Sequence, residues 1–310
     1  MTNRTGTAEF LDAADARRGA ATGIILVLLS ALAWSTSGLF ARIVPVDIWT
    51  VLAWRSLFGG LSIVALAMIE RRRFAFDWRR AFTPPGMAMM LLNATGMTSF
   101  VYALQNTTIA NVTVIYATLP FITALLAWLW FGERAARRTL IGSVVAGAGV
   151  AMTVAGTIAI GGGSHLLGDL AALYLTVSFA FMTVIMRRYR ETPMLESVGM
   201  ACLLMTVVSF YLGHPFALSS GQVAWLAAFG IVTQGGGLGI YTMGARRLPS
   251  AQAALLSASE VPMSPLWVWI FFNEVPARET FAGGALVLGA ILWNIVAGLR
   301  TSRPAGPLAP

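Results

Sequence analysis

The sequence predicts an all-α integral membrane protein with ten transmembrane helices, arranged as two inverted repeats of five helices each. Three observations support this fold class: the composition, the distribution of the arginines and an internal repeat. Of the 310 residues, 57% are hydrophobic and only 11% are charged, whereas about a quarter of the residues of an ordinary soluble domain are charged. This composition indicates that the chain folds in lipid.

Apolar stretches of membrane-spanning length follow one another along the chain with short connections. A helix needs roughly 20 mostly apolar residues to cross a hydrocarbon layer about 30 Å thick. Residues 1–19 are charged and have no apolar core, so we interpret them, like residues 300–310, as a cytoplasmic tail and not as a signal peptide. The ten predicted spans are 20–43, 48–69, 84–104, 110–131, 139–157, 166–187, 195–213, 222–244, 251–272 and 280–299.

The basic residues follow the alternation expected of a multi-pass protein. All 21 are arginines, and their clusters lie in alternate loops. Because basic residues stay on the cytoplasmic side during insertion, both termini are predicted to be cytoplasmic. Membrane-length apolar runs separate the clusters, which argues against a nucleic-acid partner. A basic set made only of arginine is typical of a GC-rich bacterial genome, so we expect the bacterial inner membrane.

An internal repeat divides the predicted helices into two halves, 20–157 and 158–299. The segment 128–142, "WLWFGERAARRTLIG", aligns with 269–283, "WIFFNEVPARETFAG", and seven of the 15 positions are identical. Chance matches in apolar sequence fall at Leu or Ala, but these include Trp, Glu, Arg and Gly. Five helices per repeat insert the second half from the opposite side, and equivalent loops do carry opposite arginine content. Inverted repeats of this kind occur in secondary transporters, whose substrate site lies near the midplane.

Four segments carry a resemblance to a known family: "LLSALAWSTSGLFAR", "WRSLFGGLSIVALAMIERRR", "YALQNTTIANVTVIYATLPFITALLAWLWFGE" and "SASEVPMSPLWVWIFFNE". With these, residues 20–299 resemble the EamA-type members of the drug/metabolite transporter superfamily. The resemblance implies ten helices in two five-helix repeats and a transport function. Val261 and Asn273 depart from the family pattern, which commonly has proline and glycine at these places. Such motifs specify the fold well and the substrate poorly.

Arg55 and Glu260 are the two ionisable residues that lie well inside predicted spans, at similar depths. A charge there costs a few kcal/mol and suggests a functional site. In one reading the pair satisfies each other, or hydrogen bonds of its neighbours, and holds the halves in register. In another, Glu260 binds a substrate amine or a proton, or Arg55 simply extends to the interface. Pro262 and Pro265 predict a kink beside Glu260, used for packing or facing a central, partly wet cavity.

Further polar and aromatic residues in the spans are candidates for substrate binding or gating. Gln234 lies in the glycine-rich "VTQGGGLGIY" and needs a hydrogen-bond partner. For each of these residues the alternative is helix packing or a place in the aromatic belt at the membrane interface. The other candidates are Trp34, Tyr102, Asn106, Tyr116, Tyr174, Tyr241 and Trp267.

Patterns for catalysis or cofactor binding are missing from the sequence. His165 and His214 fall in predicted outer loops, far from paired carboxylates and from Cys202, the single cysteine. The "GGGSH" at 161–165 lacks the Gly-Lys-Ser/Thr ending of a phosphate-binding loop. We therefore expect neither an enzyme nor a cofactor or metal.

The predicted function is a secondary transporter, an exporter of small organic metabolites such as amino acids or related amphipathic compounds, that works by alternating access. Its expected partners are a small-molecule substrate and the lipid bilayer. Three alternatives remain open at this point: a non-transporting membrane scaffold or receptor, an intramembrane enzyme, and a metabolite importer. Loss of function on neutralising Glu260 separates the transporter from the scaffold.

Overall fold

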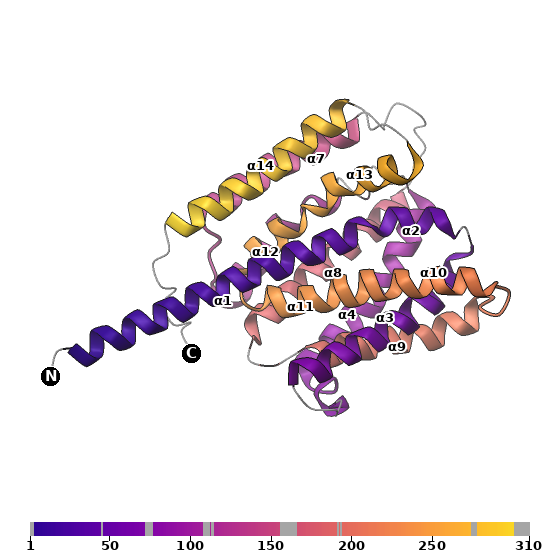
Figure 1. Ribbon diagram of the computed structural model, residues 1–310, viewed down its shortest axis with the longest axis horizontal. Helices are drawn as coiled ribbons and strands as arrows, with labels where there is room; N and C mark the ends of the chain where they lie inside the picture. Colours follow the sequence, from indigo (N-terminus) through magenta and orange to yellow (C-terminus); the bar gives the residue numbers. More distant parts are fainter. Residues whose placement is uncertain are drawn as a thin grey trace.

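The computed structural model of the protein describes residues 3–44, 46–71, 77–107, 112, 115–155, 166–190, 192, 194–273 and 278–300. Throughout this part the regular elements are helices, which run alongside one another in an elongated bundle (Figure 1). The all-helical class is therefore confirmed. The beginning of α1 and the end of α14 lie toward the same side of the bundle (Figure 1), in agreement with the termini predicted on one side of the membrane.

The described helices follow most of the predicted spans, but α1 begins at Asn3, inside the predicted tail, and α6 begins at Leu119, nine residues into the predicted span 110–131. Helices of the first half are α1 (Asn3–Ser35), α2 (Ser37–Ile43), α3 (Ile48–Arg71), η1 (Trp78–Arg80), α4 (Pro84–Asn106), α6 (Leu119–Phe131) and α7 (Arg137–Ala155). Helices of the second half are α8 (Leu166–Arg188), α9 (Leu195–Leu212), α10 (Ser220–Gly230), η2 (Ile231–Gly239), α11 (Ile240–Ala245), α12 (Ser250–Ser257), α13 (Glu260–Phe272) and α14 (Arg278–Arg300).

Among the described residues, seven segments are long and apolar enough to cross a membrane. They correspond to seven of the ten predicted spans, and helices α4, α6 and α7 occupy the remaining three. The seven segments are Arg18–Phe40, Ile48–Glu70, Leu166–Arg188, Leu195–Leu212, Ser220–Ala245, Ser250–Phe272 and Phe281–Gly298.

The outer surface of the bundle is apolar, as lipid contact requires. Large hydrophobic side chains such as Leu91, Leu129 and Leu292 are 64%, 66% and 62% exposed. Soluble monomers rarely expose contiguous apolar patches of more than a few hundred Å². The chain is therefore a multi-pass membrane protein.

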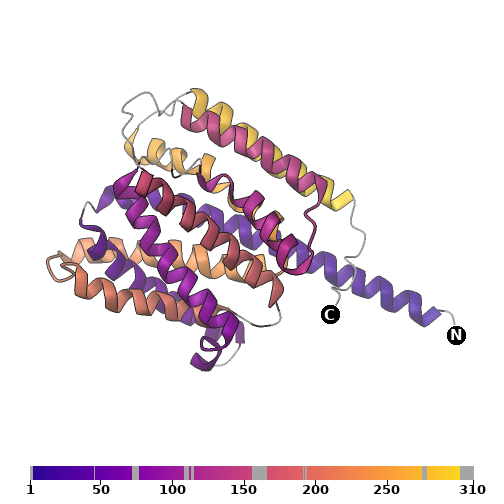
Figure 2. The ribbon, with the colours of Figure 1, turned by 180° about the vertical axis from the view of Figure 1, so that it is seen from behind.

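The two halves of the chain pack against each other through several pairs of helices. Helix α3 runs against α9, α4 against α8, and α7 against α14, so that each of these pairs joins one half to the other. Both views show α7 and α14 side by side at one edge of the bundle (Figures 1 and 2). The main hydrophobic core lies between these pairs and includes Leu52, Met89, Val198 and Leu256.

The aligned segments of the two halves share a detail of backbone conformation. Gly132 ends α6 with a φ of 71°, and Asn273 ends α13 with a φ of 55°. These are equivalent positions in the alignment, and they are the only described residues with positive φ. Asparagine is one of the few residues besides glycine that visits this left-handed region routinely. The departure from the family pattern at Asn273 therefore preserves the helix cap.

Candidate functional site

Glu260 is the first residue of α13, immediately after the interruption that separates α12 from α13. The interruption has a local cause, because Pro262 has no N–H to donate to the carbonyl oxygen of Ala258. The Val261 N–H donates to this oxygen instead, at 3.2 Å, in a tighter turn. The predicted break beside Glu260 is therefore present, and it lies at residues 258–259. The wet cavity that we expected there remains a prediction.

The carboxyl group of Glu260 lies among apolar and aromatic helices. In the part of the chain that the structure describes, no arginine forms an ion pair with it. The side chain is half-buried, and its charge interacts electrostatically with the side chains of Tyr116 and Tyr241. Glu260 is thus a carboxyl group within the bundle that forms no ion pair with the described arginines.

Four aromatic rings form a contiguous group, which we call the aromatic cluster: Trp34, Tyr116, Phe179 and Tyr241. The ring centroid of Phe179 lies 5.6 Å from that of Trp34, 6.1 Å from that of Tyr116 and 5.1 Å from that of Tyr241. The rings of Trp34 and Tyr241 are 5.2 Å apart. Tyr241 is fully buried and its hydroxyl shares a hydrogen bond of 2.9 Å with Thr183, whereas the other three rings are half-buried.

The cluster draws its rings from both halves of the chain. Trp34 lies at the end of α1 and Tyr116 shortly before α6, while Phe179 lies in α8 and Tyr241 in α11. Three of these residues were candidates from the sequence, and Phe179 was not. An apolar residue in an apolar helix carries no signal of its own, so Phe179 could be found only through its neighbours.

The position of Trp34 depends on the glycine-rich segment. Residues Ile231–Gly239 form a π-helix in which the Ile240 N–H donates to the Gly235 carbonyl oxygen, five residues back. A Cβ atom on Gly237 would lie 2.3 Å from the indole Nε1 of Trp34. The indole can therefore rest on this backbone only because residue 237 is glycine. π-Helical turns inside α-helices occur frequently at functional sites.

Trp267 connects α13 to the same region. Its indole Nε1–H donates a hydrogen bond of 2.8 Å to Ser35 Oγ, the residue after Trp34. This bond ties the helix that begins with Glu260 to the end of α1. Trp267 is half-buried, and it belongs to the surroundings of the aromatic cluster.

Arg55 and Gln234 have partners elsewhere. The Arg55 Nε–H donates to Thr233 Oγ1 at 3.2 Å, and its guanidinium lies 4.8 Å from the ring centroid of Phe229. The Gln234 Nε2–H donates to Met97 Sδ at 3.4 Å. Among the described contacts Arg55 does not pair with Glu260, so the reading in which neighbours satisfy Arg55 is the one that these contacts favour.

The remaining candidates lie on exposed parts of the helices. Tyr102 is 42% and Tyr174 44% exposed, and the Tyr174 hydroxyl donates to Thr95 Oγ1 at 2.9 Å. Asn106 is exposed at the end of α4, where its Nδ2–H donates to the Tyr102 carbonyl oxygen at 2.9 Å. In the described part of the chain, neither Tyr102 nor Tyr174 makes a ring contact with the aromatic cluster.

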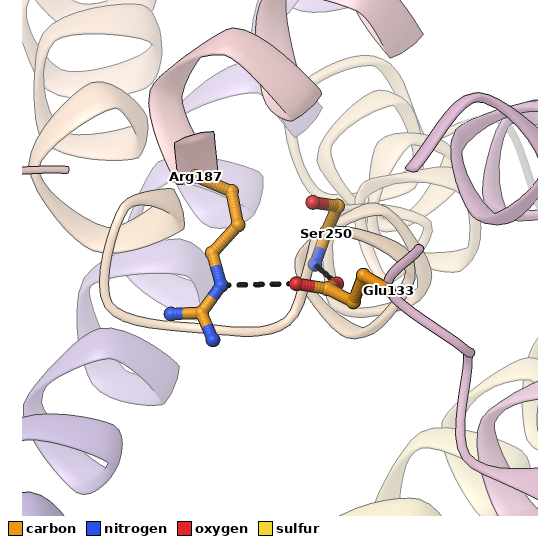
Figure 3. Close-up of polar contacts among 3 residues, drawn as sticks. All are labelled: Glu133, Arg187 and Ser250. Atoms are coloured by element: carbon orange, nitrogen blue, oxygen red, sulfur yellow. Dashed lines mark hydrogen bonds and ion pairs between the residues drawn. The ribbon is translucent and has the colours of Figure 1, made fainter. Parts of the chain in front are cut away.

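A second polar group joins the two halves at the arginine-rich ends of the helices. Arg187 Nε donates to Glu133 Oε2 at 3.2 Å, and the Ser250 N–H donates to Glu133 Oε1 at 2.9 Å (Figure 3). The left-handed cap at Gly132 reverses the chain just before Glu133. A further ion pair links Glu70 at the end of α3 to Arg246 after α11. We call these contacts the end clamps, and sequence reasoning had not singled them out.

Among the described residues, no group of three or more His, Cys, Asp or Glu side chains is placed to hold a metal ion. Cys202 is buried, as its apolar surroundings predict. His165 and the "GGGSH" segment lie outside the described residues.

Comparison with known proteins gives the family. Human solute carrier family 35 member G1 is 24% identical, over 90% of this chain and 79% of its own length. A riboflavin transporter of Brucella anthropi is 23% identical, over 69% of this chain and 77% of its own. A crystal structure at 19% identity superposes with a TM-score of 0.75 over 90% of this chain and 99% of that one, which shows a shared fold.

The sequence model of the EamA-like transporter family matches residues 21–155 and 166–296. These two segments nearly coincide with the halves that the internal repeat defines. The protein therefore belongs to the EamA-like transporter family, within the drug/metabolite transporter superfamily.

Proposed function

We propose that the protein is a secondary transporter that exports small organic metabolites, such as amino acids or related amphipathic compounds, by alternating access. The observation that carries this proposal is the aromatic cluster, because its four rings come from both halves of the chain and two of them, Tyr116 and Tyr241, interact electrostatically with Glu260. A site between two halves is the arrangement that inverted-repeat transporters use. Each half, 20–157 and 158–299, would supply five spanning helices, with α4, the segment ending in α6, and α7 completing ten.

The end clamps are compatible with an alternating-access cycle, in which the site opens to each side of the membrane in turn. Glu133 and Glu70 belong to the first half, whereas Arg187, Arg246 and Ser250 belong to the second. Contacts of this kind hold the halves together on the side that we propose is cytoplasmic. They would separate when the site opens to that side, and the loops opposite would close. The protein would lie in a bacterial inner membrane with both termini in the cytoplasm.

The names of the relatives do not identify a substrate for this protein. One is named for riboflavin and another only as a solute carrier, so the cargo has to be found by experiment. We would compare small-molecule pools in cells and in medium for cells with wild-type protein, with Glu260→Gln and without the protein. Glu279→Gln, which removes an exposed carboxylate in α14, is the matched control.

We expect one class of compounds to accumulate in the medium of wild-type and Glu279→Gln cells, and to remain inside Glu260→Gln cells at equal membrane abundance. Depletion of a compound from the medium of wild-type cells would mean that the protein imports this compound. Identical pools in wild-type and empty cells, across amino acids, amines, nucleosides and aromatic compounds, would favour a scaffold or receptor.

A further inference from the structure

We infer that the arginine-rich ends of α6 and α8 form a binding site for an anionic phospholipid, which we call the lipid site. The phosphate of the lipid would contact Arg134 and Arg188, and the beginning of an acyl chain would lie against Trp130 and Phe181. This inference goes beyond the proposed function and does not depend on it, because it concerns a lipid of the surrounding bilayer and not the transported compound.

The apolar part of the lipid site is a pair of aromatic rings. Helix α6 packs against α8, and the ring centroids of Trp130 and Phe181 lie 6.2 Å apart with their planes at 66°. Trp130 is the next-to-last residue of α6 and is 47% exposed. Tryptophan is enriched in membrane proteins at the level where hydrocarbon gives way to headgroups. The ring pair therefore marks the depth at which the acyl chains of a lipid begin.

The first basic residue of the lipid site follows from the geometry of α8. Phe181 and Arg188 are seven residues apart, so they lie on the same face of the helix, with Arg188 about 10 Å nearer its end. Arg188 is the last residue of α8 and is exposed. Its guanidinium thus lies beyond the ring pair, at the level of the headgroups. A guanidinium donates two parallel hydrogen bonds to a phosphate.

The second basic residue comes from the end clamp between α6 and α8. Glu133 and Arg187 face each other from these two segments (Figure 3), and Arg134 and Arg188 directly follow them in the chain. Both following residues are exposed. Because Glu133 is already bonded to Arg187 and to the Ser250 N–H, two exposed arginines flank an ion pair whose charges cancel.

This combination of charge and rings favours one class of lipid. Basic residues at the membrane surface attract anionic headgroups, and each adds to the affinity. Phosphatidylglycerol has a single negative charge on its headgroup, whereas phosphatidylcholine also has a cation that the two arginines would repel. The rings offer the same contact to the acyl chains of both lipids. The lipid site should therefore select by headgroup, through Arg134 and Arg188.

The experiment uses the purified full-length chain in dodecyl maltoside and two lipids with the same acyl chains, phosphatidylglycerol and phosphatidylcholine. Native mass spectrometry measures the affinity for each lipid, and the thermal unfolding midpoint measures the stabilisation that binding produces. We expect phosphatidylglycerol to bind at least about tenfold more tightly than phosphatidylcholine, and to raise the midpoint further. The double variant Arg134→Gln/Arg188→Gln should lose this preference, because each arginine contributes about fivefold.

Controls separate the lipid site from folding and from general attraction to basic residues. Arg79→Gln removes an exposed arginine of η1, which packs against α9, and should bind phosphatidylglycerol like wild type. Without added lipid, the double variant should unfold at the wild-type midpoint, since both arginines are exposed. Glycerol 1-phosphate, a headgroup without acyl chains, should not stabilise the protein.

Three results would overturn the inference. These are equal affinities of wild type for the two lipids, wild-type affinity of the double variant for phosphatidylglycerol, and stabilisation by glycerol 1-phosphate as large as that by the lipid. The last result would indicate a site for free phosphate compounds. A failure of the protein to transport any compound would overturn the proposed function and leave the lipid site standing.

Discussion

At position 237, even a methyl group would collide with the indole of Trp34. The substitution Gly237→Ala would place Cβ 2.3 Å from Trp34 Nε1, so the ring must move. We expect Gly237→Ala to lower the free energy of unfolding by about 1–3 kcal/mol, as overpacking does in other protein cores. The thermal unfolding midpoint of the detergent-solubilised protein should fall, and transport should fall with it.

The neighbouring glycine provides a control in the same helix. A Cβ atom on Gly236 would meet Ala33 Cβ at 3.5 Å, which is an ordinary contact. Gly236→Ala should therefore be neutral or slightly stabilising, since alanine is favoured over glycine within helices. Equal unfolding midpoints for the two variants would show that the contact between Trp34 and Gly237 does not restrain the ring.

Asp47 caps the N-terminus of α3, just outside the membrane-spanning segment. Its Oδ1 accepts the Thr50 N–H at 3.0 Å. Partial burial raises the pKa of Asp47, but the hydrogen bonds from Thr50, the charge of His214 and the hydrogen bond from the Trp49 backbone together outweigh burial and keep the pKa below its ordinary value. Because the pKa is lower in the folded protein, the stabilisation is present above the unfolded-state pKa of about 4 and is lost as the pH falls.

We expect Asp47→Ala to lower the unfolding free energy by about 1 kcal/mol at neutral pH. Asp47→Asn should retain most of the cap, because its amide oxygen still accepts from Thr50. Unfolding midpoints at pH 7 and below pH 4 would measure the difference between Asp47→Ala and wild type. A difference that grows as the pH falls would contradict the assignment of the cap to the carboxylate.

The end clamps are polar contacts that join helices of the two halves. Glu133 follows α6 and bonds both Arg187 in α8 and the first N–H of α12. The Arg187 and Glu133 side chains are only 11% and 13% exposed, so the pair is well protected from solvent. We expect Glu133→Ala to reduce the free energy of unfolding by about 2 kcal/mol, because the largely buried Arg187 side chain is left without this partner.

The free energy of unfolding of Glu133→Gln should lie between those of Glu133→Ala and wild type, since an amide oxygen still accepts the hydrogen bond from the Ser250 N–H. The exposed neighbour Arg134 supplies the control, and Arg134→Ala should leave the unfolding midpoint unchanged. A double-mutant cycle between Glu133 and Arg187 would measure their coupling directly. Additive effects in that cycle would mean that the ion pair does not join the two halves.

The positions of the helices along the chain could be predicted from the sequence more easily than the contacts between helices. Apolar length predicted the seven segments that are long and apolar enough to cross a membrane, and proline chemistry predicted the break before α13, because both are local properties. The partners of Arg55, Thr233 in η2 and Phe229 in α10, could not be predicted, since they depend on how these elements and α3 are rotated and how deep each residue lies. Glu260 could be singled out because a carboxylate in an apolar segment is costly. Phe179 could not, since nothing distinguishes it from other apolar residues of α8.

The arginine pattern predicts which loops of the whole molecule lie on which side of the membrane, and one labelling experiment can test this prediction. Cys202 is the only cysteine and is buried, so a Cys202→Ser background offers no other thiol to a reagent. Phe216, 86% exposed, lies between α9 and α10 on the predicted outer side. Arg134 is exposed between α6 and α7 on the predicted cytoplasmic side.

With a membrane-impermeant maleimide, Phe216→Cys should be labelled in intact cells, whereas Arg134→Cys should be labelled only after the membrane is opened. The reason is that basic loops resist translocation, and the loop that carries Arg134 also contains Arg137 and Arg138. Placing the two sites on opposite sides would also place the end clamps in the cytoplasm, next to Arg134. Labelling of Arg134→Cys in intact cells would mean that the protein has the opposite orientation in the membrane. The end clamps would then lie at the outer face.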